Sequence, residues 1–193
     1  MKKLKGNLYK PGESATTYTG DSFESLTPGA YICKVSQVKD DPDKEYLYLE
    51  YDIAEGEHAG YYERLSDRAG FWGGRVWLSY KDKAQSIFSR AIKAINVSNP
   101  NFIFNPFEDG KNADEKTLIG KTFAIVLHEE EYDKNDGSVG TRLSASATAI
   151  ITLAQAKEGK FNKKLLEKVS RRQEQASSGD TEFLEISSEN PFA

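Results

Sequence analysis

The chain has 193 residues, of which 38% are hydrophobic and 11% aromatic, and its formal net charge is −4. This length accommodates one domain, or one domain with a tail. The single cysteine, Cys33, excludes an internal disulfide framework, and we expect it to be a small buried residue. No apolar run reaches membrane-spanning length, and none follows the basic residues 1–5. We therefore expect no membrane association, no signal peptide and a cytoplasmic location.

The charge is unevenly distributed along the chain. Residues 173–193 contain five acidic residues and no Lys or Arg, which leaves 26 basic and 25 acidic residues in the rest. The acidic overall charge therefore does not exclude a polyanionic partner, because local patches determine the field that a partner meets. The Ser- and Glu-rich composition of residues 173–193 predicts a disordered acidic tail.

Alternation of apolar and polar residues predicts three strands in the first half of the chain. They cover residues 31–36, 45–54 and 61–80, the last interrupted by glycines. They follow an irregular lead-in over residues 1–27 and begin a folded domain that we expect to span residues 28–172. One face of the second strand is apolar and is expected to lie in the core: Leu47, Leu49, Tyr51 and Ile53.

The second half is predicted to contain one helix and two more strands. Apolar residues at spacings of three and four predict a helix over 82–98. Strands are expected over 121–131 and about 141–151, joined by an Asn-Asp-Gly hairpin turn at 135–137, and residues 152–172 favour a C-terminal helical segment. The order is typical of the OB-fold, a five-stranded barrel with a helix between strands three and four, although the match is not unique to that fold.

The second strand carries the first candidate binding residues. If its apolar face is in the core, Tyr46 and Tyr48 point outward, roughly 6.5–7 Å apart. Unstacked bases can lie on such a pair of rings. The alternative is that both rings pack beneath a loop or against a second copy of the chain.

The segment 61–80 carries the second candidate set, because it interleaves aromatic residues with arginines. Arginine contacts phosphates and also stacks on rings, and glycine allows close backbone approach. The pattern favours single-stranded over duplex nucleic acid, because bases must be exposed to stack. The alternative is an ordinary pair of strands with Trp77 in the core. The candidate DNA-binding residues are Lys34, Tyr46, Tyr48, Tyr62, Arg64, Arg68, Phe71, Trp72, Arg75 and Trp77.

Several catalytic motifs fail on spacing. Residues 118–122 end like a P-loop, but they lack its first glycine and precede a predicted strand instead of a helix. Residues 133–140 lack calcium ligands at the required positions. The acidic run 129–131, beside His128, is divided between the two faces of a strand. We therefore expect a protein that is not an enzyme, with no metal site and no cofactor.

Two segments of the sequence resemble known single-strand binders. The run Leu26-Thr27-Pro28-Gly29-Ala30-Tyr31 and the run from Glu45 to Gly60, with its Ile-x-Glu-Gly end, resemble phage-encoded single-stranded-DNA-binding proteins of the OB-fold type. This resemblance covers roughly residues 26–150. The end of the chain, Ser188-Glu189-Asn190-Pro191-Phe192-Ala193, is similar to the acidic Pro-Phe tip with which bacterial single-strand binders recruit replication and repair enzymes, although here Ala193 follows the phenylalanine.

The resemblance implies a non-catalytic protein that coats single-stranded DNA in phage replication or recombination, in the cytoplasm of the bacterial host. Binding would be sequence-tolerant and would weaken with salt. We also expect a homodimer, and a tail that recruits replication or recombination proteins through Glu189, Asn190, Pro191 and Phe192. Two alternatives remain: a β-barrel protein-interaction factor for phage assembly or host inhibition, and a nuclease that uses the carboxylates of residues 129–133.

Overall fold

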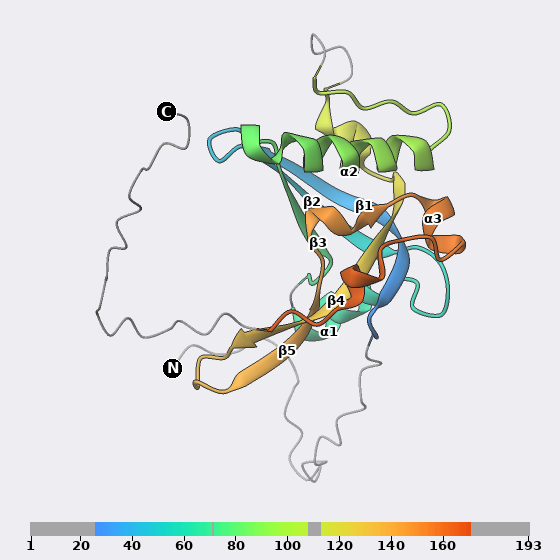
Figure 1. Ribbon diagram of the computed structural model, residues 1–193. Coiled ribbons are helices and arrows are strands. Elements are labelled where there is room, and N and C mark those ends of the chain that lie inside the picture. Colours follow the sequence, from blue (N-terminus) through green and yellow to red (C-terminus); the bar gives the residue numbers. More distant parts are fainter. Residues whose placement is uncertain (1–25, 71, 108–112, 171–193) are drawn as a thin grey trace, which may run out of the picture.

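The computed structural model describes residues 26–70, 72–107 and 113–170 (Figure 1). The predicted lead-in before Leu26 lies outside these ranges, as do the candidate residue Phe71 and the expected acidic tail. The tail residues outside the described ranges include Glu189, Asn190, Pro191 and Phe192. Within these ranges, no helix combines the length and the apolar character that crossing a bilayer requires.

The described residues form a mainly β fold around one antiparallel sheet of six strands, which confirms the expected mainly β class but not the closed five-stranded barrel. The strands are β1 (Gly29–Asp41), β2 (Tyr46–Ile53), β3 (Arg75–Ser79), β4 (Thr122–Asp133), β5 (Val139–Ser144) and β6 (Ile150–Ile151). The α-helices are α1 (Tyr61–Ala69), α2 (Gln85–Ser98) and α3 (Leu153–Lys157). The 3₁₀ helices are η1 (Asp82–Ala84), η2 (Glu115–Leu118), η3 (Ala147–Ala149) and η4 (Lys163–Leu166).

The strands follow the order β3-β2-β1-β4-β5, and β6 also pairs with β4. Among the described residues no strand pairing joins β3 to β5, so both are edge strands of an open sheet. The helix α2 lies between β3 and β4 in the chain, which confirms the predicted position of a helix between the third and fourth strands. In Figure 1, α2 lies across one end of the strands, and the β4–β5 hairpin projects from the opposite end.

The core confirms the predicted inner face of β2. Its four apolar residues are at most 3% exposed, whereas the residues between them are partly exposed. Leu47 lies opposite Leu78, and Leu49 lies opposite Val76, so β3 extends the same buried layer. The buried face of α2 covers this layer, and Cys33 is fully buried on β1, as expected.

The prediction of an extended segment beginning at residue 61 is wrong, because residues 61–69 form α1. The Asp52 carboxylate of β2 accepts hydrogen bonds from two backbone N–H groups of the first turn, at 2.8 and 3.1 Å. A helix leaves its first N–H groups without intrahelical partners, so this carboxylate stabilises the start of α1. Gly60 and Gly70 flank the helix in the left-handed region, both with φ of 73°, which suits glycine.

Two predictions for the second half need correction. The predicted strand over 141–151 is divided, because β5 pairs with the outer part of β4 and β6 pairs with its inner part, with η3 between them. The C-terminal helical segment is reduced to α3 and η4, since Gly159 adopts a left-handed φ of 65° just after α3. Val169 then forms a parallel bridge with β4 at Glu130.

We predict that Gly74→Ala destabilises the fold strongly. A β-carbon at Gly74 would collide with the backbone oxygen of Tyr51 and would lie 2.6 Å from the ring of Tyr62. Backbone atoms cannot yield, so we expect urea denaturation to show a loss of more than about 2 kcal/mol. Gly29→Ala is the control, because its β-carbon would meet its nearest atom at 3.6 Å, an ordinary contact. Equal stability of both variants would contradict this packing.

Candidate nucleic-acid interface

Aromatic and charged side chains lie together on the outer face of β2 and β3. The strand register places Tyr48 opposite Trp77 and Glu50 opposite Arg75. The rings of Tyr48 and Trp77 are 5.3 Å apart between centroids, with planes tilted by 52°. Trp77 is 53% exposed, so the alternative that places Trp77 in the core is wrong. Two rings therefore lie together on one face of the sheet, as a stacking surface requires, with Tyr48 partly exposed.

Two more predicted residues border this face. Tyr46 precedes Tyr48 by two residues on β2 and is partly exposed, and the Lys44 ammonium lies 5.9 Å from its ring centroid. Lys34 is exposed on β1, where it pairs in register with Asp52 of β2. The outer face therefore carries a row of side chains across three strands, as alternation along β2 predicts.

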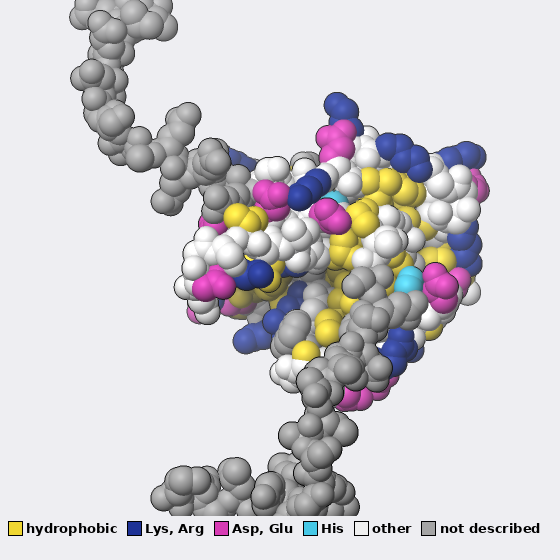
Figure 2. All heavy atoms as spheres, turned by 90° about the horizontal axis from the view of Figure 1, so that it is seen from below, with side chains coloured by type: hydrophobic (Ala, Val, Ile, Leu, Met, Phe, Trp, Pro, Cys, Tyr) yellow, Lys and Arg dark blue, Asp and Glu magenta, His cyan; other side chains and the backbone are white. Residues whose placement is uncertain are grey.

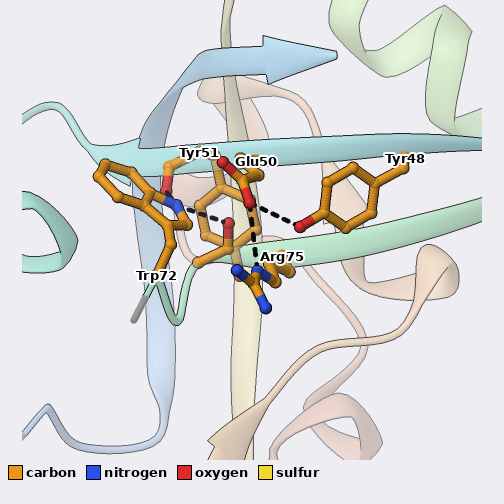
Figure 3. Close-up of polar contacts among 6 residues, drawn as sticks. Tyr48, Glu50, Tyr51, Trp72 and Arg75 are labelled. Atoms are coloured by element: carbon orange, nitrogen blue, oxygen red, sulfur yellow. Dashed lines mark hydrogen bonds and ion pairs between the residues drawn. The ribbon is translucent and has the colours of Figure 1, made fainter. Parts of the chain in front are cut away.

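The Glu50 carboxylate holds the side chains of Tyr48 and Arg75 in place, as Figure 3 shows. Glu50 accepts a hydrogen bond of 2.6 Å from the hydroxyl of Tyr48 and one of 3.2 Å from Nε of Arg75. Burial, and then the bond to Glu50 and its charge, raise the pKa of Tyr48 to about 12. The hydrogen bond from the phenol to Glu50 holds the ring beside Trp77.

A cleft of about 670 Å³ separates this face from the β4–β5 hairpin. Residues of α1 and β3 line one wall, and residues of β5 line the other, so the cleft lies between the two edge strands of the sheet. Arg75 and Arg142 supply its cations from opposite walls, and Glu129 is the only acidic residue among the described residues that line it. The cleft-lining aromatic residues are Tyr51, Tyr61, Tyr62, Trp72 and Trp77.

Arg142 on β5 belongs to the site but is absent from the predicted set. Its Nε and Nη2 lie 3.0 and 2.9 Å from Oε2 of Glu130, and its guanidinium lies 5.4 Å from the ring centroid of Tyr132. Arg142 could have been found from the sequence, because the hairpin turn predicted at 135–137 places it beside Glu130. No local signal brings β5 to face β3, because that juxtaposition depends on the whole sheet.

The prediction that Tyr62 contacts DNA needs correction. Its ring is 5% exposed and packs edge-on against Tyr51, with centroids 5.6 Å apart. Burial raises the pKa of Tyr62, as expected for a phenol held away from water. The prediction was wrong because it assumed a strand from residue 61. The segment forms the helix α1 instead, which turns the ring of Tyr62 toward the core. A buried ring cannot stack on a base.

Trp72 is held more firmly than its glycine-rich surroundings predict. Its indole Nε1–H donates to the backbone oxygens of Tyr51 and Gly74, both at 3.1 Å, and the ring is half-buried against the core (Figure 3). The side chain also lines the cleft. Trp72 thus forms part of the cleft wall, and its contact with DNA remains a prediction.

The predicted arginines of α1 are both exposed, and neither is among the described residues that line the cleft. Arg64 is exposed and donates from Nη1 to the backbone oxygen of Ala59. Arg68 is exposed three residues after Leu65, a cleft-lining residue, so the two share one side of the helix. Their contact with DNA also remains a prediction.

The acidic run on β4 is paired with basic residues. Glu130 contacts Arg142, and Oε1 of Glu131 lies 2.7 Å from Nζ of Lys168. In the described part of the chain, no group of three or more His, Cys, Asp or Glu residues is arranged to hold a metal ion. Figure 2 shows basic, acidic and hydrophobic side chains side by side on the face that is seen from below.

No protein-family model matches the chain, and no curated protein matches it either. The geometry of the cleft and of the β2–β3 face is therefore the basis for a functional proposal.

We predict that the two tryptophans differ in their effect on stability. Trp72→Ala removes a half-buried ring and two hydrogen bonds, so we expect the free energy of unfolding to fall by about 2 kcal/mol. Trp77→Ala removes a ring that is 53% exposed, and we expect a loss of less than about 1 kcal/mol. Urea denaturation of both variants gives the comparison. A larger loss for Trp77→Ala would place that ring in the core.

Proposed function

We propose that the protein binds single-stranded DNA without catalysing a reaction, in phage DNA replication or recombination. The observation that supports this proposal best is the pair of exposed Trp77 and partly exposed Tyr48 beside a cleft that carries Arg75 and Arg142. Every base has a π-face, so stacking on the two rings tolerates any sequence, while the guanidinium groups contact phosphates. The phage setting, the homodimer and the host cytoplasm come from the sequence resemblance and remain predictions.

The geometry favours a single strand over a duplex. The rings of Tyr48 and Trp77 lie together on the outer face of the sheet, and bases within a duplex are already stacked on each other and closed to such rings. The two arginines lie on opposite walls of one cleft, where a single backbone can contact both. Deoxyribose or ribose would fit this scheme equally, and titration with DNA and RNA homopolymers distinguishes them.

The same proposal treats the sheet as an OB-type barrel that is open between β3 and β5. The strand order and the position of α2 between β3 and β4 support it. OB-folds bind oligonucleotides with the face of their second and third strands and with the loops after strands one and four. The cleft borders the β2–β3 face and the β4–β5 hairpin, which correspond to these regions.

We predict that Trp77→Ala weakens binding to a fluorescent oligo(dT) by roughly 5- to 140-fold, because stacking contributes about 1–3 kcal/mol per base. Fluorescence anisotropy at two salt concentrations measures the affinity. Phe107→Ala is the matched control, because Phe107 is also 53% exposed but lies beside α2, 5.8 Å from Phe88, and is absent from the cleft lining. We expect this control to bind like the wild type.

The same titration separates the competing functions. If the wild type does not bind oligo(dT) even at low salt, the proposal is wrong, and a protein-interaction factor whose exposed rings contact another protein becomes the better hypothesis. Cleavage of the oligonucleotide in the presence of magnesium would instead indicate a nuclease. Binding that does not weaken with salt would contradict the phosphate contacts assigned to the two arginines.

The acidic tail is proposed to recruit replication or recombination proteins through its Pro-Phe end, as the resemblance implies. We predict that deletion of residues 180–193 leaves the affinity for oligo(dT) equal or higher, because the deletion removes acidic residues that repel phosphate. Anisotropy of the truncated chain against the full chain gives the result. Lower affinity after the deletion would show that the tail takes part in DNA binding, against the recruitment role.

A further inference from the structure

Each wall of the cleft presents an arginine that is already paired with a glutamate. On β2 and β3, Glu50 contacts Arg75 at 3.2 Å, and on β4 and β5, Glu130 contacts Arg142 at 2.9 Å. In both pairs the two residues are direct cross-strand neighbours. The arrangement therefore follows from the strand register on both sides of the cleft.

In both pairs the arginine is more exposed than the glutamate. Arg75 is 40% exposed against 15% for Glu50, and Arg142 is 58% exposed against 30% for Glu130. Both arginines line the cleft, whereas neither of these two glutamates does. The cleft therefore offers a phosphate the guanidinium groups of these pairs and not their carboxylates.

The hydrogen bonds leave donors for such a phosphate. Glu50 uses only Nε of Arg75, and Glu130 uses Nε and Nη2 of Arg142. A guanidinium carries five N–H groups, so each arginine keeps donors that its glutamate does not engage. The glutamates thus orient the arginines, but they also place a negative charge close to the position of a bound phosphate.

We propose that Glu50 and Glu130 limit the affinity for single-stranded DNA and so keep the bound strand exchangeable. This inference rests on the proposed function. Their oxygens hold the arginines in place, and their charges repel the phosphate. At a separation of about 4–5 Å in a water-like medium, the removal of one such charge corresponds to about fivefold tighter binding. A protein that coats DNA transiently needs this balance, because its strand must later be released to enzymes that copy or recombine it.

The substitutions Glu50→Gln and Glu130→Gln test the proposal, because an amide keeps an oxygen that accepts a hydrogen bond and loses the charge. We expect each to bind oligo(dT) about fivefold more tightly than the wild type, with slower dissociation in stopped-flow displacement by unlabelled oligonucleotide. Glu50→Ala and Glu130→Ala lose the oxygen as well, so we expect them to bind less tightly than the corresponding glutamine variants.

Glu158→Gln is the control for net charge. Glu158 also pairs with a cation, at 2.7 Å from Nζ of Lys160, but it lies after α3 and outside the cleft lining. We expect its affinity to stay within about twofold of the wild type, because exposed charges farther apart than the Debye length are screened. A gain equal to that of Glu50→Gln would show that net charge alone is responsible, and would overturn the proposal.

Two further results are decisive. If the wild type binds oligo(dT) and both glutamine variants bind equally or more weakly, the glutamates only position the arginines, and this inference is wrong while the proposed function stands. If the wild type does not bind oligo(dT) at any salt concentration, both the proposed function and this inference are wrong. Urea denaturation of each variant confirms that the fold is intact before affinities are compared.

Discussion

The antiparallel register between β2 and β3 is the constraint on which the candidate site depends. Leu49 lies opposite Val76 on the buried side, and this contact forces Tyr48 opposite Trp77 and Glu50 opposite Arg75 on the outer side. A shift of one residue would send every inner side chain to the surface. The hydrophobic core therefore fixes the ring pair and the arginine–glutamate pair, although neither belongs to the core.

The two walls of the cleft differ in how they are supported. On the α1 and β3 wall, Trp72 is tied to the backbone at Tyr51 and Gly74, and Asp52 holds the first turn of α1. The opposite wall belongs to the β4–β5 hairpin, which projects from the sheet and carries Arg142 with 58% exposure (Figure 1). One wall is therefore tied to the backbone by hydrogen bonds, whereas the arginine of the other wall is more exposed.

A helix or strand was predictable from the sequence where its apolar residues recur with a single spacing along its whole length. The alternation in β2 and the three-four spacing in α2 depend on neighbours along the chain, and both predictions are confirmed. The helix α1 was not predictable in this way, because its first turn is capped by Asp52, a residue of another element. Tyr62 was consequently misassigned to the surface. The predicted strand would have pointed its side chain outward, whereas the helix points it into the core.

The sequence by itself determined which side chains of β2 point outward, because burial of one strand face leaves the other face exposed whatever the partners are. It also determined the uneven distribution of charge along the chain. Only the tertiary structure decided that β3 and β5 are edges facing one cleft, that Arg142 lies across from Arg75, and that Glu50 pairs with Arg75. Arg75 and Arg142 are more than 60 positions apart in the chain, and their meeting at one cleft depends on strand pairings that no local pattern encodes.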